Sequence, residues 1–160
     1  MISRMMPTPQ QSEITPKLVE ALYLEAMALA DSARQYFDVD GAEDRGGLDP
    51  LARVTFSCES LKITTRLMHV VAWLMVRKAV EAGELTASEA IVPARRLGRA
   101  GDAGGQDVRQ DLLPPRARSL MAASIDLYDR VKRLDAQLGG DAPDASDDAR
   151  ARLDRLRASI

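Results

Sequence analysis

The chain has 160 residues, of which 46% are hydrophobic and 29% are charged, and this balance is typical of a globular protein with one core. Aromatic residues make up only 4% of the sequence, too few to fill a β-sandwich or barrel, so the composition favours helices. A formal net charge of −2 argues against a general nucleic-acid binder. One cysteine and one histidine exclude an intramolecular disulfide and a structural zinc site. We therefore expect a protein without catalytic activity, metal or cofactor.

Signals of secretion and membrane insertion are also missing from the sequence. Residues 1–14, which we expect to be a flexible N-terminus, contain no apolar run of the kind that a signal peptide needs. The longest apolar run, Leu67 to Val76, is interrupted by His69 and is much shorter than the roughly 20 residues that cross a bilayer. We expect a cytoplasmic protein that does not contact membranes.

The first predicted helix covers residues 16–37. Thr15 is a typical helix cap and Pro16 suits the first helical position. Apolar residues then recur at spacings of three and four, as in an amphipathic helix that packs along its full length on another helix. These residues are Val19, Leu22, Ala26, Leu29, Ala33 and Tyr36.

A second helix is predicted over residues 50–82, with Asp49 as its cap, Pro50 at its first position and Gly83 just beyond its end. Two apolar stripes run along it on opposite sides, which predicts a central helix buried on both faces. The first stripe is Leu51, Val54, Cys58, Leu61, Thr65, Met68, Ala72, Met75, Ala79 and Ala82. The second stripe is Phe56, Ile63, Leu67, Val70 and Leu74.

The rest of the chain predicts one more long helix. A capping box from Thr86 to Glu89 predicts a short helix over about 87–97, followed by a flexible glycine-containing loop over 98–111. The last long helix covers 115–138, and 139–160 has the composition of a flexible tail. The fold class is therefore all-α: an antiparallel three-helix bundle over 15–138 with a long central helix.

The second stripe raises the question of what covers it. We expect a homodimer, with Phe56, Ile63, Leu67, Val70 and Leu74 as its contacts. The alternative is that the first and last helices simply pack on opposite sides of the central helix.

Polar residues on the central helix offer little chemistry. Cys58 and His69 share a helical face but lie about 16 Å apart along the axis, which excludes a dyad within one chain. A core cysteine and a packed or partly exposed histidine are the better interpretations. Glu59 and Arg66 either form a polar belt that fixes helix register or a subunit contact, or belong to a partner-binding patch.

The stretch from Cys58 to Leu74 resembles the signature of the RcdA family, the regulators of CtrA degradation in alphaproteobacteria. It contains Glu-Ser-Leu-Lys-Ile-Thr-Thr-Arg-Leu-Met, followed by an apolar run that ends in Trp73-Leu74. Residues 24–29 and 36–38 resemble the family's first helix, and residues 127–135 resemble its last helix. The likeness spans about residues 20–138.

This resemblance implies a small, non-enzymatic, dimeric helical bundle. Such proteins act as adaptors or regulators that help deliver cell-cycle proteins to the ClpXP protease. In the tail, Leu153, Leu156 and Ile160 recur at helical spacing and are candidate partner-binding anchors, together with Glu59 and Arg66. The alternative function is a structural or phospho-signalling bundle whose protein partner is not a protease.

Overall fold

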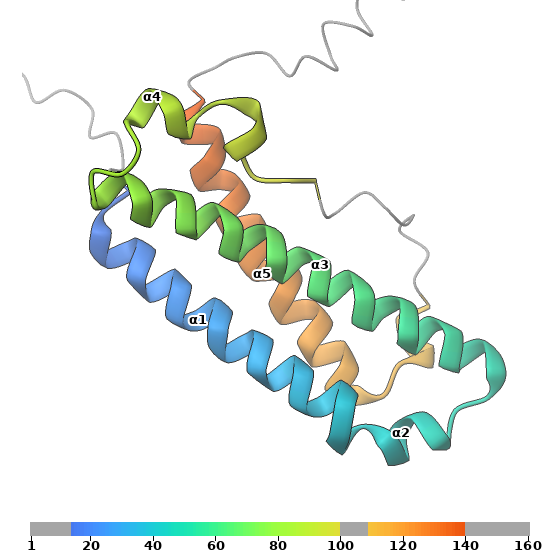
Figure 1. Ribbon diagram of the computed structural model, residues 1–160. Helices are drawn as coiled ribbons and strands as arrows, with labels where there is room; N and C mark the ends of the chain where they lie inside the picture. The colour runs from blue at the N-terminus through green and yellow to red at the C-terminus, as the bar shows by residue number, and fades with distance from the viewer. Residues whose placement is uncertain (1–13, 100–108, 140–160) are drawn as a thin grey trace, which may run out of the picture.

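The computed structural model describes residues 14–99 and 109–139, and helices dominate this part of the chain (Figure 1). The long helices are α1 (Pro16–Gln35), α3 (Pro50–Glu81) and α5 (Pro115–Leu138). Two short helices are α2 (Ala42–Gly46) and α4 (Ala87–Ala90). No strand occurs in the described residues. The predicted all-α bundle with a long central helix is confirmed.

The first two long helices begin at the predicted positions, each with a capping residue followed by a proline. The Thr15 hydroxyl accepts a hydrogen bond from the Leu18 amide at 3.1 Å, and the Asp49 carboxylate accepts one from the Ala52 amide at 2.8 Å. In each case the next residue is a proline, whose missing N–H costs nothing in the first turn. The 32 residues of α3 make it about 48 Å long, at about 1.5 Å per residue.

The end of α1 is a π-helical turn, Tyr36–Asp40, rather than a continuation of the α-helix to residue 37. The turn closes through the Gly41 amide, which donates to the Tyr36 carbonyl at 2.6 Å. A Cβ atom at position 41 would lie only 2.7 Å from that carbonyl oxygen, so the turn requires glycine there. The widened turn redirects the chain into α2 and places the ring of Tyr36 in the core.

The three long helices do not alternate in direction. Helix α1 runs antiparallel to the other two, as the predicted antiparallel bundle requires, but α3 and α5 run parallel (Figure 1). The pairings agree, because Arg66 contacts Ser124 and Trp73 contacts Asp135, so the residue numbers rise together. The connection between α3 and α5 therefore crosses back along the whole bundle, as in other helix bundles with one long crossover.

The crossover carries less helix than the sequence predicts. In place of one short helix over 87–97, α4 stops at Ala90 and a separate 3-10 turn covers Pro93–Arg95. The predicted capping box between Thr86 and Glu89 is present, but Pro93 cannot donate a backbone hydrogen bond and breaks the helix. The predicted loop over 98–111 lies largely outside the described residues, and its last part enters a 3-10 turn at Gln110–Leu112. The N-terminus and the tail lie outside the described residues, apart from residues 14 and 139.

One hydrophobic core lies between the three long helices. Helix α1 contributes Val19, Leu22 and Ala26, and α5 contributes Leu127 and Val131, all buried. At the α2 end of the bundle, the rings of Tyr36, Phe37 and Phe56 pack edge to face, with centroids 5.1 to 6.0 Å apart. Burial and the hydrogen bond to Asp44 both raise the pKa of the Tyr36 phenol, so this core tyrosine stays neutral.

The prediction that α3 is buried on both faces is wrong. Its second stripe lies inside the core, with Ile63, Val70 and Leu74 completely covered. Its first stripe is exposed from Leu51 to Met75, and Leu61 and Met68 keep 69% and 67% of their surface in contact with solvent. The reason is geometric: α1 and α5 also pack on each other, through Glu25 and Arg130 for example, so both lie on the same half of α3.

Candidate functional site

A line of three residues on α3 faces α5 at intervals of seven. Glu59, Arg66 and Trp73 are all buried, and two heptads along a helix return to nearly the same angular position. We call these three residues, with Ser124, Asp135 and Arg96, the polar seam. It contains the Arg and Trp of the signature stretch, which hydrophobic packing alone would not require.

At one end of the polar seam, an ion pair is enclosed in the core. The Arg66 Nη1 atom lies 3.0 Å from Glu59 Oε1 and donates to the Ser124 hydroxyl at 3.1 Å. That hydroxyl in turn donates to the Met121 carbonyl at 2.8 Å. Glu59 is 1% exposed and Arg66 8%, so neither charge is solvated and each depends on the other. The second carboxylate oxygen, Glu59 Oε2, has no hydrogen-bond partner among the described residues.

At the other end of the seam, Asp135 joins three parts of the chain. Its Oδ1 atom accepts from the Trp73 indole at 2.9 Å and from Arg96 Nε at 2.8 Å. Arg96 also donates to the Asp135 carbonyl at 3.0 Å. The crossover connection is thereby attached to both α3 and α5.

Two further contacts hold the crossover against the same flank of α3. The Tyr128 hydroxyl donates to the Gly98 carbonyl at 2.6 Å. The His69 ring lies so close to Gly98 that a Cβ atom there would be 2.1 Å from Nδ1. His69 is therefore half-covered by backbone, which agrees with a packed histidine and leaves no room at Nδ1 for a phosphoryl group.

Beside the seam, the Arg77 guanidinium is partly buried. Burial lowers the pKa of its guanidinium, partly offset by Asp135 and Glu81. The Cζ atom of Arg77 lies 5.9 Å from the centre of the Trp73 ring. Its Nη2 atom has no hydrogen-bond partner among the described residues. The hydrogen-bonding groups of the seam thus bond mainly to one another, and these bonds hold α3, α5 and the crossover together.

The structure corrects two of the predicted interaction sites. The predicted dimer contacts Phe56, Ile63, Leu67, Val70 and Leu74 are all buried within one chain, because α1 and α5 cover them. Glu59 and Arg66 are also buried and paired with each other, so they form the register-fixing belt and no partner-binding patch. Leu153, Leu156 and Ile160 lie outside the described residues.

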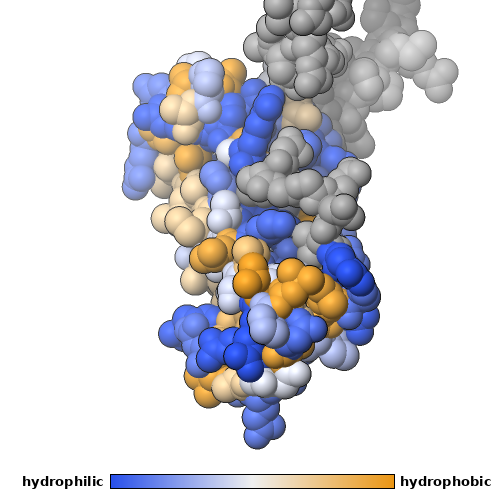
Figure 2. Space-filling model, turned by 90° about the vertical axis from the view of Figure 1, so that its right-hand side faces the viewer, coloured by the Kyte–Doolittle hydropathy of each residue, from blue (hydrophilic) through white to orange (hydrophobic). Residues whose placement is uncertain are grey.

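Cys58 belongs to the exposed first stripe and is not the core cysteine that the sequence suggests. The exposed residues of this stripe form an almost continuous apolar line on the outside of α3. They are Leu51, Val54, Cys58, Leu61, Met68, Ala72 and Met75. Hydrophobic residues also appear among hydrophilic ones on the face drawn in Figure 2, toward the α2 end of the bundle. An apolar line of this length on the outside of a helical bundle is typical of a protein-interaction surface.

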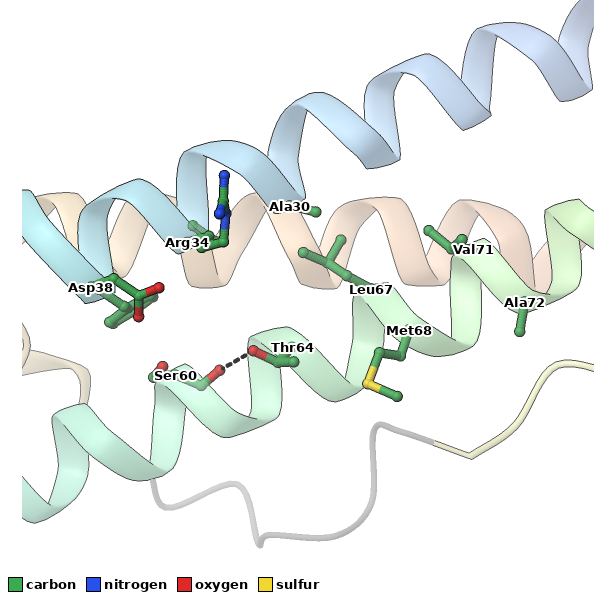
Figure 3. A pocket seen from close by; sticks show the side chains of 11 residues that line it. Ala30, Arg34, Asp38, Ser60, Thr64, Leu67, Met68, Val71 and Ala72 are labelled. Carbon is green, nitrogen blue, oxygen red and sulfur yellow. Dashed lines mark hydrogen bonds between the residues drawn. The ribbon is translucent and has the colours of Figure 1, made fainter.

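Next to the first stripe, a groove of about 570 Å³ opens between α1 and α3 (Figure 3). We call it the α1/α3 groove. Its walls are mostly apolar, with Arg34 and Asp38 on the α1 side. Its lining is Ala30, Ala33, Arg34, Phe37, Asp38, Ser60, Thr64, Leu67, Met68, Val71 and Ala72.

No group of three or more His, Cys, Asp or Glu side chains that could hold a metal ion occurs in residues 14–99 and 109–139. Over the same ranges, none of the helices combines the length and the apolar character needed to span a bilayer. What the geometry provides is a rigid bundle with one apolar outer face.

The sequence did not predict that Trp73 of the signature stretch, with Ser124 and Asp135 on α5, belongs to the site. The seven-residue spacing of Glu59, Arg66 and Trp73 was a usable signal, since it places three hydrogen-bonding side chains on one line. Their partners on α5 could not be found this way, because Ser124 and Asp135 are ordinary helix residues in the sequence.

Comparisons with known proteins agree with the geometry. The family model for proteins of unknown function DUF1465 matches residues 10–160. The crystal structure of RcdA from Caulobacter crescentus CB15 is similar, with 30% identical residues and a TM-score of 0.63, over 80% of this chain and 96% of that one. A search of curated proteins finds no match.

Breaking the buried ion pair from one side should be costly. We expect Arg66→Met to lower the free energy of unfolding by about 3 to 5 kcal/mol, because it leaves the Glu59 carboxylate buried without a counter-charge. The double variant Glu59→Leu/Arg66→Met should recover most of that loss, since no unpaired charge remains. Urea denaturation followed by circular dichroism measures both; an Arg66→Met variant as stable as the parent would contradict the buried pair.

Proposed function

Because the chain belongs to the RcdA family, whose sequences match the DUF1465 model, we propose that it is a non-enzymatic adaptor that helps deliver cell-cycle regulatory proteins to the ClpXP protease. The observation that carries the proposal is the similarity to RcdA over nearly the whole of that protein's length. The exposed first stripe supports a function through protein contacts, since no described part of the chain covers its large apolar side chains.

An adaptor needs a rigid surface for one protein and a means of holding a second protein nearby, because tethering raises the local concentration of the second. The polar seam supplies rigidity, since it joins α3, α5 and the crossover with side-chain hydrogen bonds. In this proposal the protein works in the cytoplasm, and its partners are ClpXP-pathway proteins and a regulatory cargo protein.

We further propose that two copies associate through the first stripe. The first stripe takes the place of the second stripe as the proposed dimer surface, and the expectation of a homodimer is unchanged. The support is the exposure of large apolar side chains along one line of α3: 61% for Leu51, 60% for Val54 and 51% for Met75. A two-fold axis across α3 would set each of these stripes against its copy.

The alternative, a phospho-signalling bundle, finds no support in the site. A phosphorylated histidine needs an accessible ring nitrogen, and the backbone of Gly98 lies against the Nδ1 side of the His69 ring. A structural bundle with a non-protease partner would use the same apolar face, so the adaptor function has to be tested in cells.

The adaptor function predicts a shared set of stabilised proteins. When translation is blocked, cell-cycle regulators should decay more slowly in cells that lack this chain and also in cells that lack ClpX. Quantitative proteomics over time measures both sets. If the proteins stabilised by loss of the chain are no more frequent among ClpXP substrates than in the whole proteome, the adaptor function is wrong.

The dimer surface is tested by substituting exposed residues only. Val54→Glu/Leu61→Glu should give a folded monomer, with the free energy of unfolding of the monomer changed by no more than about 0.5 kcal/mol, as usual for surface positions. Leu67→Glu is the matched control, because it places the same charge in the core, where it should unfold the bundle. Sedimentation velocity gives the mass. A parent chain that is monomeric at every concentration, or a double variant that still dimerises, would contradict the proposal.

A further inference from the structure

The crossover contacts one flank of α3, the one toward α5, while the flank toward α1 is open in the described residues. On the flank toward α5, both described ends of the crossover lie against α3: Gly98 contacts His69, and Leu112 lies with Lys62 at a smaller hollow. On the flank toward α1, none of the described residues of the crossover lines the α1/α3 groove. The groove is therefore an open seat between two antiparallel helices, where a further helix would complete a four-helix arrangement.

The floor of the groove is apolar and its polar groups are mostly satisfied. Ala30, Leu67 and Val71 lie between the two helices (Figure 3). The Thr64 hydroxyl is bonded back to the Ser60 carbonyl at 3.0 Å, so it leaves its methyl group to face an occupant. Arg34 is paired with Asp31 at 3.8 Å, and Asp38 has no ion-pair partner among the described residues. The groove suits an apolar helix face bordered by positive charge.

The chain itself contains such a segment. Residues 150–160 read Arg-Ala-Arg-Leu-Asp-Arg-Leu-Arg-Ala-Ser-Ile, with four arginines and a single acidic residue. Leu153, Leu156 and Ile160 fall on one face at helical spacing, while Ala151 and Ala158 fall on the opposite face. The α1 side of the groove belongs to a part of the chain, residues 17–45, that carries seven acidic and three basic groups. Most of these acids are paired elsewhere, so Asp38 is the acidic group of the groove lining that such arginines can meet.

The segment between α5 and residue 150 is also long enough to reach the α1/α3 groove. Helix α5 ends at Leu138, one turn beyond Asp135, which is level with Trp73 and so with the near end of the groove at Ala72. Residues 140–149 can span about 33 Å when extended, at about 3.3 Å per residue. The path around one neighbouring helix is on the order of 20 Å, twice the distance of about 10 Å between packed helices. As a helix, residues 150–160 would be about 16 Å long, comparable to the stretch of α3 from Ser60 to Ala72.

We propose that residues 150–160 of this chain dock as an amphipathic helix in the α1/α3 groove, with Leu153, Leu156 and Ile160 against its floor and an arginine toward Asp38. While this segment is docked, a partner helix competes with it for the same groove. The groove then acts as a seat that the chain itself occupies when no partner competes.

A photo-cross-linker at the groove tests this contact in the full-length chain. With p-benzoylphenylalanine at Thr64, an exposed position that lines the groove, ultraviolet light should join residue 64 to residues 150–160 of the same chain, with a yield that does not depend on protein concentration. Thr65 is the matched control site, because it has the same side chain and hydrogen bond but points away from α1. Mass spectrometry identifies the joined peptides and separates links within one chain from links between two.

Two tail variants make the result specific. Leu153→Asp/Leu156→Asp should reduce the cross-link from residue 64 by about tenfold or more, the factor that corresponds to about 1.4 kcal/mol of docking free energy. Ala151→Asp/Ala158→Asp makes the same change of charge on the opposite face and should keep most of the yield. Equal loss in both variants would mean that charge alone attracts the tail, and the apolar docking would be wrong. Links between two chains, links to other segments only, or no link from residue 64 would each overturn the proposal.

Discussion

The buried ion pair between Glu59 and Arg66 constrains the rest of the structure. Neither charge can face solvent in the folded chain, and each would be expensive to bury alone, so the two must enter the core together. Arg66 also needs the Ser124 hydroxyl, which exists at one register of α5 only. A purely apolar contact between α3 and α5 would tolerate sliding; this contact does not. The pair therefore fixes which half of α3 is inside and which residues of α5 lie beside it.

The proposed interaction surfaces follow from the half of α3 that is left outside. The N-terminal part of the crossover is attached to one flank by the contacts of Arg96 with Asp135 and of Gly98 with His69 and Tyr128, on the side where α3 and α5 meet. The first stripe and the α1/α3 groove then stay uncovered by the described part of the chain. An adaptor requires such an arrangement, because the core holds one geometry while the outer face is free to exchange partners.

Much of the fold follows from local chemistry that the sequence displays. The caps and prolines at Thr15-Pro16 and Asp49-Pro50 predict where α1 and α3 begin, and Gly83, which has a positive φ of 74°, lies just beyond α3 as expected. Heptad periodicity predicts three long helices. The parallel course of α5 did not follow from the sequence, because a connection as long as the crossover permits either direction.

The candidate site was harder to predict, for a physical reason. Both stripes of α3 are apolar, so periodicity could not say which one faces the core. Residue size was a better signal, since the second stripe has Phe56, Ile63 and Leu67 where the first has Cys58, Thr65 and Ala72. Glu59 and Arg66 looked like surface residues because their burial depends on Ser124, which lies 58 residues beyond Arg66 in sequence.

The sole cysteine allows the orientation of α3 to be measured without any substitution. Cys58 lies on the first stripe, so in dilute solution its thiol should react with a small thiol reagent at a rate close to that of the urea-unfolded chain. A thiol inside the core reacts only after unfolding and is protected by the full stability of the fold. Reaction of the native chain at nearly the unfolded rate is the result that the buried Glu59–Arg66 pair predicts. Protection that persists at every dilution, and disappears only in urea, would mean that the first stripe is inside and the account is wrong.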